Sequence, residues 1–274
     1  MIPKTAGNQA TVTTSTTKIA IPTYSDGSVT LESTRQQAAP VLPVKVYLPR
    51  EAVSSYGNHK LGKIAKDGTM VYSSTTKDGV STAVQALGNS SVRIQTVMMS
   101  NKSGSTFTYS FGNAVPQLQA NGTVNLVQTT QVSTKYGVVT VDAIVGTIDR
   151  AWAVDANGKA VTTRYTINQK KELVQIVQTD KNTRFPVVAD PTVGWTWQGI
   201  NIYFNRSETK ALANQWIGLA SLVAGILPYA AYAGVAMGTV NWYANWAYNA
   251  GMCLKWTYPI TITTFGRYSG GSCR

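Results

Sequence analysis

The chain has 274 residues, enough for one or two domains with a substantial buried core. Only 13% of the residues are charged, and 24 Lys and Arg against 12 Asp and Glu give a net charge of +12. Such an excess favours anionic partners such as a bacterial membrane or cell envelope, but the basic residues are scattered, so nucleic acid is not expected as a partner.

Residues 1–40 are rich in Thr, Ser and Gln. This composition offers little apolar surface to offset the entropy cost of ordering, and it predicts a flexible leader. The start at Met1-Ile2-Pro3-Lys4 lacks the apolar stretch of a signal peptide. Either the protein is not secreted, or this is a mature chain with an added initiator Met. A Thr-rich leader is typical of the residues just past a cleavage site and favours the second option. We therefore expect a secreted, extracellular protein that associates with a target membrane.

Residues 41–191 carry short runs of alternating apolar and polar residues, which predict strands. The runs lie at 69–73, 91–98, 106–111, 123–127, 138–141, 151–154, 161–167 and 173–178. Dipeptides that favour hairpin turns separate several of them, at Asp67-Gly68, Asp78-Gly79, Asn121-Gly122 and Asn157-Gly158. We expect an antiparallel β-rich domain over 41–191, either a sandwich or a twisted sheet, with 151–167 as a clear hairpin.

The composition changes after residue 185. Two prolines make 186–191 an extended connector, because each disfavours helix in the residue before it. An aromatic strand is predicted over 195–204. Asn205 and Glu208 then resemble a capping box, which predicts a helix that begins there.

From Ala211 to Leu254 the chain has no charged residue. We expect helices over 212–227 and 229–252, interrupted at Pro228, and a short strand over 256–264. Each helix would be roughly 30 Å long, enough to cross a hydrocarbon core. The predicted fold class is α+β, with a third region over 192–274 that holds the aromatic strand, an apolar helical hairpin and the C-terminus.

The two cysteines, Cys253 and Cys273, both lie in the last 22 residues. An even number at this spacing favours a disulfide, and with it an oxidising compartment. The loop would contribute about 3 kcal/mol on the chain-entropy estimate. Two separate free thiols are the alternative.

The motif Phe185-Pro186-Val187-Val188-Ala189-Asp190-Pro191, together with Tyr203-Phe204-Asn205-Arg206-Ser207-Glu208-Thr209, resembles a group of secreted actinobacterial proteins of uncharacterised function. These proteins share a PVVADP connector and an apolar C-terminal module with a cysteine pair. The hairpin at Trp152 is similar to theirs, so the resemblance covers roughly residues 140–274. It implies export from a Gram-positive actinobacterium and brings no activity or catalytic residue.

No pattern in the sequence predicts an enzyme. His59 is the only histidine, and it has no acidic neighbour and no nucleophile motif. The carboxylates Asp142, Asp149 and Asp155 were considered as a calcium site or an acid pair, but their spacing does not match a calcium loop, and Asp155 fits a turn. We expect no catalytic residue, cofactor or metal.

The C-terminal module carries the strongest functional signal. Gly234 and Gly238 form a GxxxG motif, and Asn241, Asn245 and Asn249 form a polar stripe at helical spacing, beside Trp242 and Trp246. In a pore the stripe would face water and the aromatic residues would lie at the membrane interfaces. The alternative is a buried hairpin or an oligomer interface with the stripe toward solvent.

The leading hypothesis is a secreted, non-enzymatic, membrane-active protein of the bacteriocin-like or pore-forming kind, which acts through this hairpin. Its positive charge would first concentrate it on an anionic surface. The alternative is a soluble protein that binds a cell envelope or surface, in which the hairpin is core or joins copies in a homo-oligomer.

Overall fold

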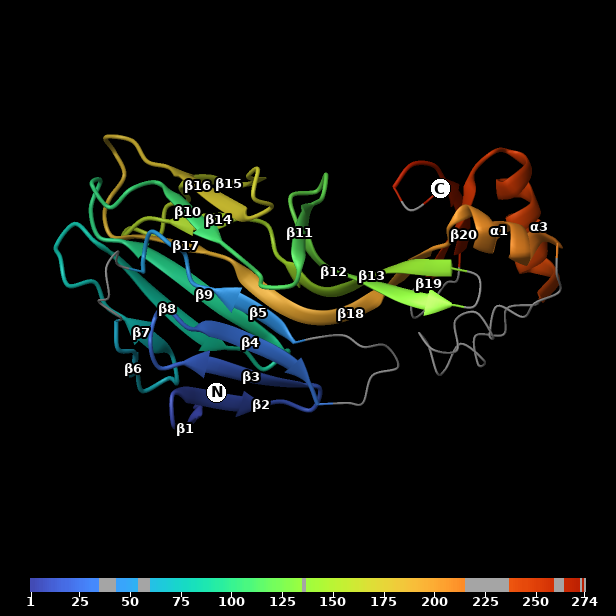
Figure 1. Cartoon of the computed structure of the whole chain (residues 1–274). Coiled ribbons are helices and arrows are strands. Elements are labelled where there is room, and N and C mark those ends of the chain that lie inside the picture. The colour runs from blue at the N-terminus through green and yellow to red at the C-terminus, as the bar shows by residue number, and fades with distance from the viewer. Residues whose placement is uncertain are drawn as a thin grey trace. The chain divides into compact units, whose positions relative to one another are not determined.

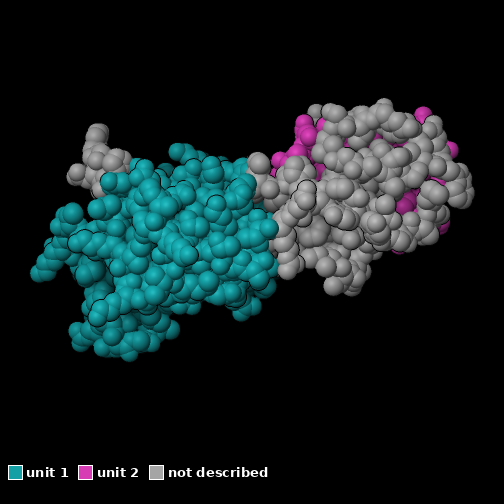
Figure 2. All heavy atoms as spheres, turned by 90° about the horizontal axis from the view of Figure 1, so that it is seen from below, with its two compact units in different colours: residues 1–35, 42–127, 145–196 teal, residues 36–41, 128–144, 197–274 magenta. Residues whose placement is uncertain are grey.

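The computed structural model is an antiparallel, β-rich α+β fold with two helices late in the described part of the chain (Figure 1). The structure describes residues 1–34, 43–53, 60–134, 137–214, 237–258, 264–271 and 273. The chain divides into two compact units. Unit 1 comprises residues 1–35, 42–127 and 145–196, and unit 2 comprises 36–41, 128–144 and 197–274 (Figure 2). The units thus divide five residues after the predicted boundary at 191, and unit 2 also draws on 128–144, which we had assigned to the β-rich domain.

The N-terminal segment of unit 1 is a folded sheet, so the prediction of a flexible leader over 1–40 is wrong for its first 33 residues. Five antiparallel strands pair in chain order: β1 (Lys4–Ala6), β2 (Gln9–Thr13), β3 (Thr17–Pro22), β4 (Ser28–Ser33) and β5 (Val44–Tyr47). Val12 of β2 and Leu31 of β4 are buried between less buried polar neighbours, and Ile19, Ala20 and Ile21 of β3 are all buried. The average composition concealed these apolar positions, which give the sheet a buried face that offsets the cost of ordering.

The rest of unit 1 is built from further antiparallel strands. Four of these pair in the spatial order β9-β8-β7-β6, with bounds β6 (Lys63–Ile64), β7 (Met70–Tyr72), β8 (Val80–Ala86) and β9 (Ser91–Met98). A three-stranded sheet has the order β10-β16-β15, with bounds β10 (Thr106–Tyr109), β15 (Thr162–Ile167) and β16 (Leu173–Gln178). Strand β11 (Val115–Leu118) pairs with the start of β12 (Val124–Thr134), and β13 (Gly137–Ile148) follows. The predicted strands 91–98 and 173–178 coincide with β9 and β16.

The predicted connector at 186–191 is a strand. Residues Val187–Asp190 form β17, which pairs with β9 on one side and with β14 (Trp152–Val154) on the other. The predicted hairpin over 151–167 is correspondingly short. Its turn forms, with Gly158 at φ 75°, but only Val154 and Ala160 bridge across it before β15 pairs with β16 instead. Local turn signals therefore identified the turn but not the partners of its strands.

Unit 2 contains both described helices. Strand β18 (Thr192–Tyr203) runs from residues of unit 1 into unit 2, and helix α1 (Arg206–Asn214) follows it. Helix α3 (Met237–Asn249) precedes strand β19 (Cys253–Tyr258), which pairs with both β18 and β20 (Thr264–Tyr268). The buried apolar side chains in and between these elements of unit 2 are Ile202, Phe204, Ala211, Leu212, Ala213, Val240, Ala244, Ala247, Cys253, Leu254 and Trp256.

The capping box at the start of α1 is confirmed. The Asn205 N–H donates to the Glu208 carboxylate, and the Glu208 N–H donates to the Asn205 side-chain oxygen, each at 2.9 Å. The two bonds satisfy N–H groups that the first helical turn leaves without partners. Of the helices predicted over 212–227 and 229–252, only residues 212–214 and 237–252 lie in the described chain, and Pro228 lies outside it. The first helix begins at Arg206 and the second ends at Asn249. The predicted terminal strand begins earlier than expected, at Cys253, and β20 adds a second strand after it.

Candidate functional site

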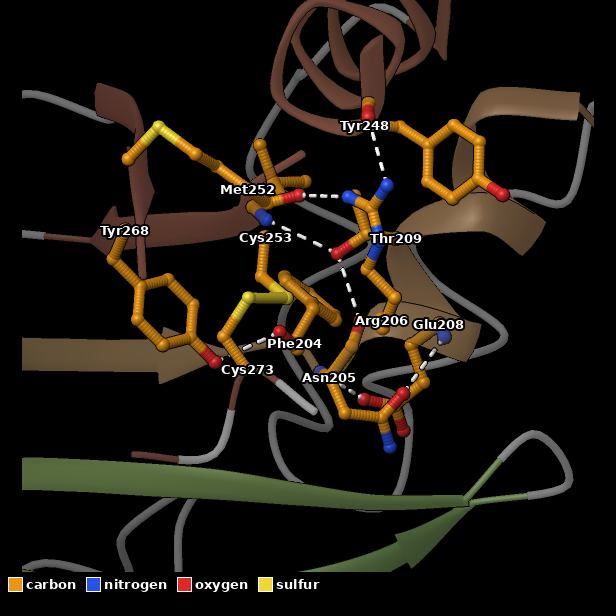
Figure 3. Close-up of a disulfide and its surroundings, with 11 residues drawn as sticks. Phe204, Asn205, Arg206, Glu208, Thr209, Tyr248, Met252, Cys253, Tyr268 and Cys273 are labelled. Carbon is orange, nitrogen blue, oxygen red and sulfur yellow. Dashed lines mark hydrogen bonds between the residues drawn. A yellow bond between two sulfur atoms is a disulfide. The ribbon is translucent and has the colours of Figure 1, made fainter. Parts of the chain in front are cut away.

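A disulfide joins the start of β19 to the C-terminal turn of unit 2, as predicted. The Cα atoms of Cys253 and Cys273 lie 5.6 Å apart and the sulfur atoms are bonded. Gly270 and Gly271 both have positive φ, 76° and 56°, so they allow the turn that brings Cys273 back to Cys253. Figure 3 shows this disulfide beside Tyr268, whose hydroxyl donates a 2.8 Å hydrogen bond to the Phe204 carbonyl. The end of β20 is therefore held by the disulfide and by the hydrogen bond from Tyr268.

Arg206, in the first turn of α1, holds the C-terminal end of α3. Its guanidinium donates to the carbonyls of Tyr248 and Met252 at 3.0 and 2.6 Å, and it lies 4.1 Å from the centre of the Tyr248 ring (Figure 3). A cation near the last carbonyls of a helix also interacts favourably with the helix dipole. Thr209 on the same helix accepts a 3.0 Å bond from the Leu254 N–H. These contacts fix α1, α3 and β19 as one framework.

The predicted asparagine stripe is turned toward α1. The Asn241 side-chain amide donates to the carbonyls of Leu212 and Ala213 at 3.2 and 2.7 Å, and the Asn245 amide donates to Ala213 at 2.9 Å. Both of our expectations, a water-lined pore and a solvent-facing stripe, had directed these amides toward water. In this structure the two amides join the helices, and only Asn249 of the three is exposed.

Trp242 and Trp246 lie side by side on the surface of α3. Their rings are stacked, with centroids 6.4 Å apart and planes within 7°, and they are 62% and 39% exposed. The Arg267 guanidinium from β20 lies 4.3 Å from the Trp246 ring, within the range of a cation–π interaction. We call Trp242, Trp246 and Arg267 the aromatic face. The sequence predicted the two tryptophans as interfacial residues, but Arg267 was missed because its approach depends on strand pairing.

Three packed aromatic rings connect α3 to β20 and β19 next to the aromatic face. The ring of Tyr243 stacks on Phe265 with centroids 5.3 Å apart, and Phe265 stacks in turn on the fully buried Trp256 at 6.1 Å. Stacked rings have few rotatable bonds and bury a large area, so they hold α3 firmly against β20. The exposed tryptophans are therefore carried on a well-packed surface.

The charged residues of the segment 197–274 are mainly basic. Residues 197–274 contain five basic residues, Arg206, Lys210, Lys255, Arg267 and Arg274, and a single acid, Glu208. That acid is buried in the capping box, whereas Lys210 and Arg267 are exposed. A surface of this kind attracts anions and offers little local repulsion to them.

The other predicted residues do not form a site in the described structure. His59 and Gly234 lie outside the described residues, and Gly238 lies in the first turn of α3. Asp142 belongs to unit 2 and accepts a hydrogen bond from Thr129, whereas Asp149 belongs to unit 1. Asp155 accepts the N–H groups of Asn157 and Lys159 in its own turn. Among the described residues, no group of three acids, histidines or cysteines is arranged to hold a metal ion.

One buried acid escaped the sequence analysis. Asp190 is fully buried at the end of β17, with Thr192 and Arg93 beside its carboxylate. Burial raises the pKa of Asp190 to about 6, and the Thr192 hydroxyl, the Arg93 guanidinium and the Trp152 side chain oppose that rise. We had assigned this residue to an extended connector, and nothing in its neighbours along the chain indicates burial.

Compared with known proteins, the chain matches no family model, no curated sequence and no solved structure. Within the described chain, neither helix has the length and hydropathy that a membrane span requires.

Proposed function

We propose that this chain is a secreted, non-enzymatic protein that binds the anionic surface of a bacterial membrane through the aromatic face of unit 2. The observation that carries the proposal is the pair of stacked, exposed rings of Trp242 and Trp246 with Arg267 beside them. Export from an actinobacterium, which the sequence resemblance implies, belongs to the same proposal, as does a bacteriocin-like role, which the charge-free segment 211–254 of a cationic chain favours.

The chemistry of the aromatic face suits the membrane interface. An indole ring has an apolar body and a polar N–H, so it is stable where acyl chains meet headgroups. A guanidinium binds phosphate through a rigid fork of N–H groups. Trp242 and Trp246 expose apolar surface to water in the free protein, and its burial among lipids is favourable at about 25 cal/mol per Å².

Charge supports the same partner. Each Lys or Arg near an anionic bilayer contributes about 1 kcal/mol of attraction. In 197–274 the basic residues outnumber the acids by five to one, and the whole chain carries +12. Attraction of this kind brings the protein to the surface before any apolar group enters it, and it weakens as salt is added.

A second step is proposed for the apolar segment. Residues 211–254 are free of charge, and we propose that this segment engages the lipid after the aromatic face has bound. Asn241 and Asn245 hold the described helices together, so the first step is binding at the interface with unit 2 folded. Release of dye from vesicles would report the later step separately from binding.

Flotation of the purified protein with vesicles tests the proposal. We expect binding to vesicles of phosphatidylglycerol and little binding to vesicles of phosphatidylcholine. Replacing both rings, by Trp242→Ser with Trp246→Ser, is expected to weaken binding about tenfold or more. The matched control is Met99→Ser, which removes a side chain that is 43% exposed in unit 1. Equal binding by the double variant and the parent protein would refute the assignment of the aromatic face.

A second candidate is a soluble protein that binds a cell-envelope polymer. It is favoured by the way α3 packs, since Val240, Ala244 and Ala247 are buried in the core of unit 2. A module that stays folded in this way has no need to enter a bilayer. Binding to isolated teichoic acid with no flotation on anionic vesicles would select this candidate over the first.

A further inference from the structure

The two Asn-Gly turns of unit 1 form a matched pair. One contains Asn121 and Gly122, between β11 and β12, and the other contains Asn157 and Gly158, after β14. Gly122 and Gly158 have φ of 85° and 75°. The N–H of each glycine donates a 2.9 Å hydrogen bond to the carbonyl three residues earlier. The two turns therefore share their backbone geometry and differ in the side chains around them.

An asparagine followed by glycine can react with its own backbone. The amide nitrogen of the glycine attacks the side-chain carbon Cγ of the asparagine, and the glycine has no Cβ to obstruct the approach. The N–Cγ bond forms and the Cγ–Nδ2 bond breaks. The proton of the attacking nitrogen passes to the leaving group, which departs as ammonia. Water then opens the succinimide ring to aspartate or isoaspartate. The asparagine side chain must first rotate until Cγ faces the glycine nitrogen.

The side chain of Asn121 is fixed by Thr123. Its Oδ1 accepts the Thr123 backbone N–H at 3.0 Å and the Thr123 hydroxyl at 2.7 Å. A backbone N–H can only donate, so the atom that accepts it is the amide oxygen and the orientation of the side chain is settled. Rotation of Asn121 towards the nitrogen of Gly122 must therefore break both hydrogen bonds.

The corresponding N–H in the second turn has a different partner. Lys159 takes the place of Thr123, two residues after the asparagine, and its N–H donates to Oδ1 of Asp155 at 2.9 Å. The same Oδ1 accepts the N–H of Asn157 at 2.9 Å, so Asp155 holds the backbone of the turn. Among the described residues, the side chain of Asn157 has no hydrogen-bond partner. Asp155 thus occupies the donor that fixes the asparagine in the first turn.

The second turn is also more open to water. Gly158 is exposed, and no atom lies within 4 Å of the place where a Cβ would be. Gly122 is half-buried, and a Cβ there would lie 3.6 Å from Cγ of Arg150. Solvent must remove the proton of the attacking nitrogen and later open the ring. The exposure of Gly158 therefore favours both steps.

We propose that Asn157 is a site of spontaneous deamidation in the folded protein, and that Thr123 protects Asn121 in the matched turn from the same reaction. The product carries a carboxylate in place of a neutral amide. An isoaspartate at this position also lengthens the backbone inside the turn, which disrupts the 2.9 Å hydrogen bond from the Asp155 N–H to the Lys159 carbonyl. The modification concerns unit 1 and does not depend on the proposed membrane binding by unit 2.

Peptide mapping by mass spectrometry tests the proposal. The folded protein is incubated in heavy-oxygen water at slightly alkaline pH, so that each hydrolysed succinimide carries the label. We expect Asn157 to be converted about tenfold faster than Asn121, because two hydrogen bonds must break before Asn121 can react. The same chain unfolded in urea is the control, and there the two asparagines should react at similar rates.

Thr123→Val provides a matched variant. It keeps the shape of the side chain and removes the hydroxyl donor to Asn121, so deamidation of Asn121 should become several-fold faster. The rate at Asn157 in the same molecule is the internal reference and should not change. Equal rates in the folded parent protein, or the same ratio of rates in the folded and the unfolded chain, would overturn the proposal. This comparison needs no variant, so it decides the question even if Thr123→Val fails to fold.

Discussion

The side-chain amide of Asn245 on α3 donates a 2.9 Å hydrogen bond to the backbone carbonyl of Ala213 on α1. Together with the bond from Asn241 to the same carbonyl, it joins the two helices, which Arg206 of α1 also joins through its bond to the Tyr248 carbonyl of α3. The asparagines thus act in the fold of unit 2. The part of α3 that we propose to bind the membrane is a different face, where the two tryptophans lie.

Replacement of Asn245 by leucine tests this structural role. The change removes the donor to Ala213 and leaves a partly buried carbonyl with one partner fewer, so unfolding should become easier by about 1–3 kcal/mol. Urea denaturation followed by tryptophan fluorescence measures the difference. Asn249→Leu is the matched control, because Asn249 is exposed and lies one turn further along the helix, and its effect should stay within about 0.5 kcal/mol. Equal effects of the two variants would show that the interhelical bond is unimportant.

Arg206 provides an independent test of the same framework. Arg206→Met keeps the aliphatic stem but loses two charge-assisted hydrogen bonds to the end of α3 and the contact with the Tyr248 ring. We expect a loss of about 2–3 kcal/mol in the free energy of unfolding. Lys210→Met, on an exposed position of α1, should have little effect. A loss that appears in both variants would point to net charge and not to the contacts of Arg206.

The disulfide contributes through the loop that it closes. Cys253 and Cys273 are 20 residues apart, and on the chain-entropy estimate the loop contributes about 3 kcal/mol. Cys253→Ala with Cys273→Ala should therefore lower the melting temperature of unit 2. Calorimetry with and without a dithiol reductant checks this, since the reductant should lower the melting temperature of the parent protein and leave the double variant unchanged. A reductant effect of equal size in both proteins would contradict the prediction.

The sequence predicted features that a few neighbouring residues determine. The capping box needs only Asn205 and Glu208, three positions apart, and the turn at Gly158 needs only its own dipeptide. The disulfide was predictable because the chain has no other cysteine. Strands such as β9 were found because their apolar residues alternate within one run.

Features that depend on distant partners were missed. Asp190 looks like a connector residue until β14 and β9 are placed on either side of β17. The direction of the Asn245 amide depends on α1, and the position of Arg267 depends on the register of β20 with β19. The N-terminal strands were missed for a different reason, because composition was averaged over 40 residues and the short apolar run from Ile19 to Ile21 was lost in the average.

Arg267 is the residue whose replacement separates electrostatic binding from apolar binding at the aromatic face. Arg267→Gln should weaken binding to phosphatidylglycerol vesicles about fivefold at low salt, because a basic residue near an anionic bilayer contributes about 1 kcal/mol. The difference should shrink as salt is raised, since the interaction is between exposed charges. Lys18→Gln makes the same change of charge on an exposed position of β3 in unit 1 and is expected to leave binding nearly unchanged. If the two variants lose affinity equally, the net charge of the chain and not the site beside Trp246 attracts the membrane, and the role assigned to Arg267 is wrong.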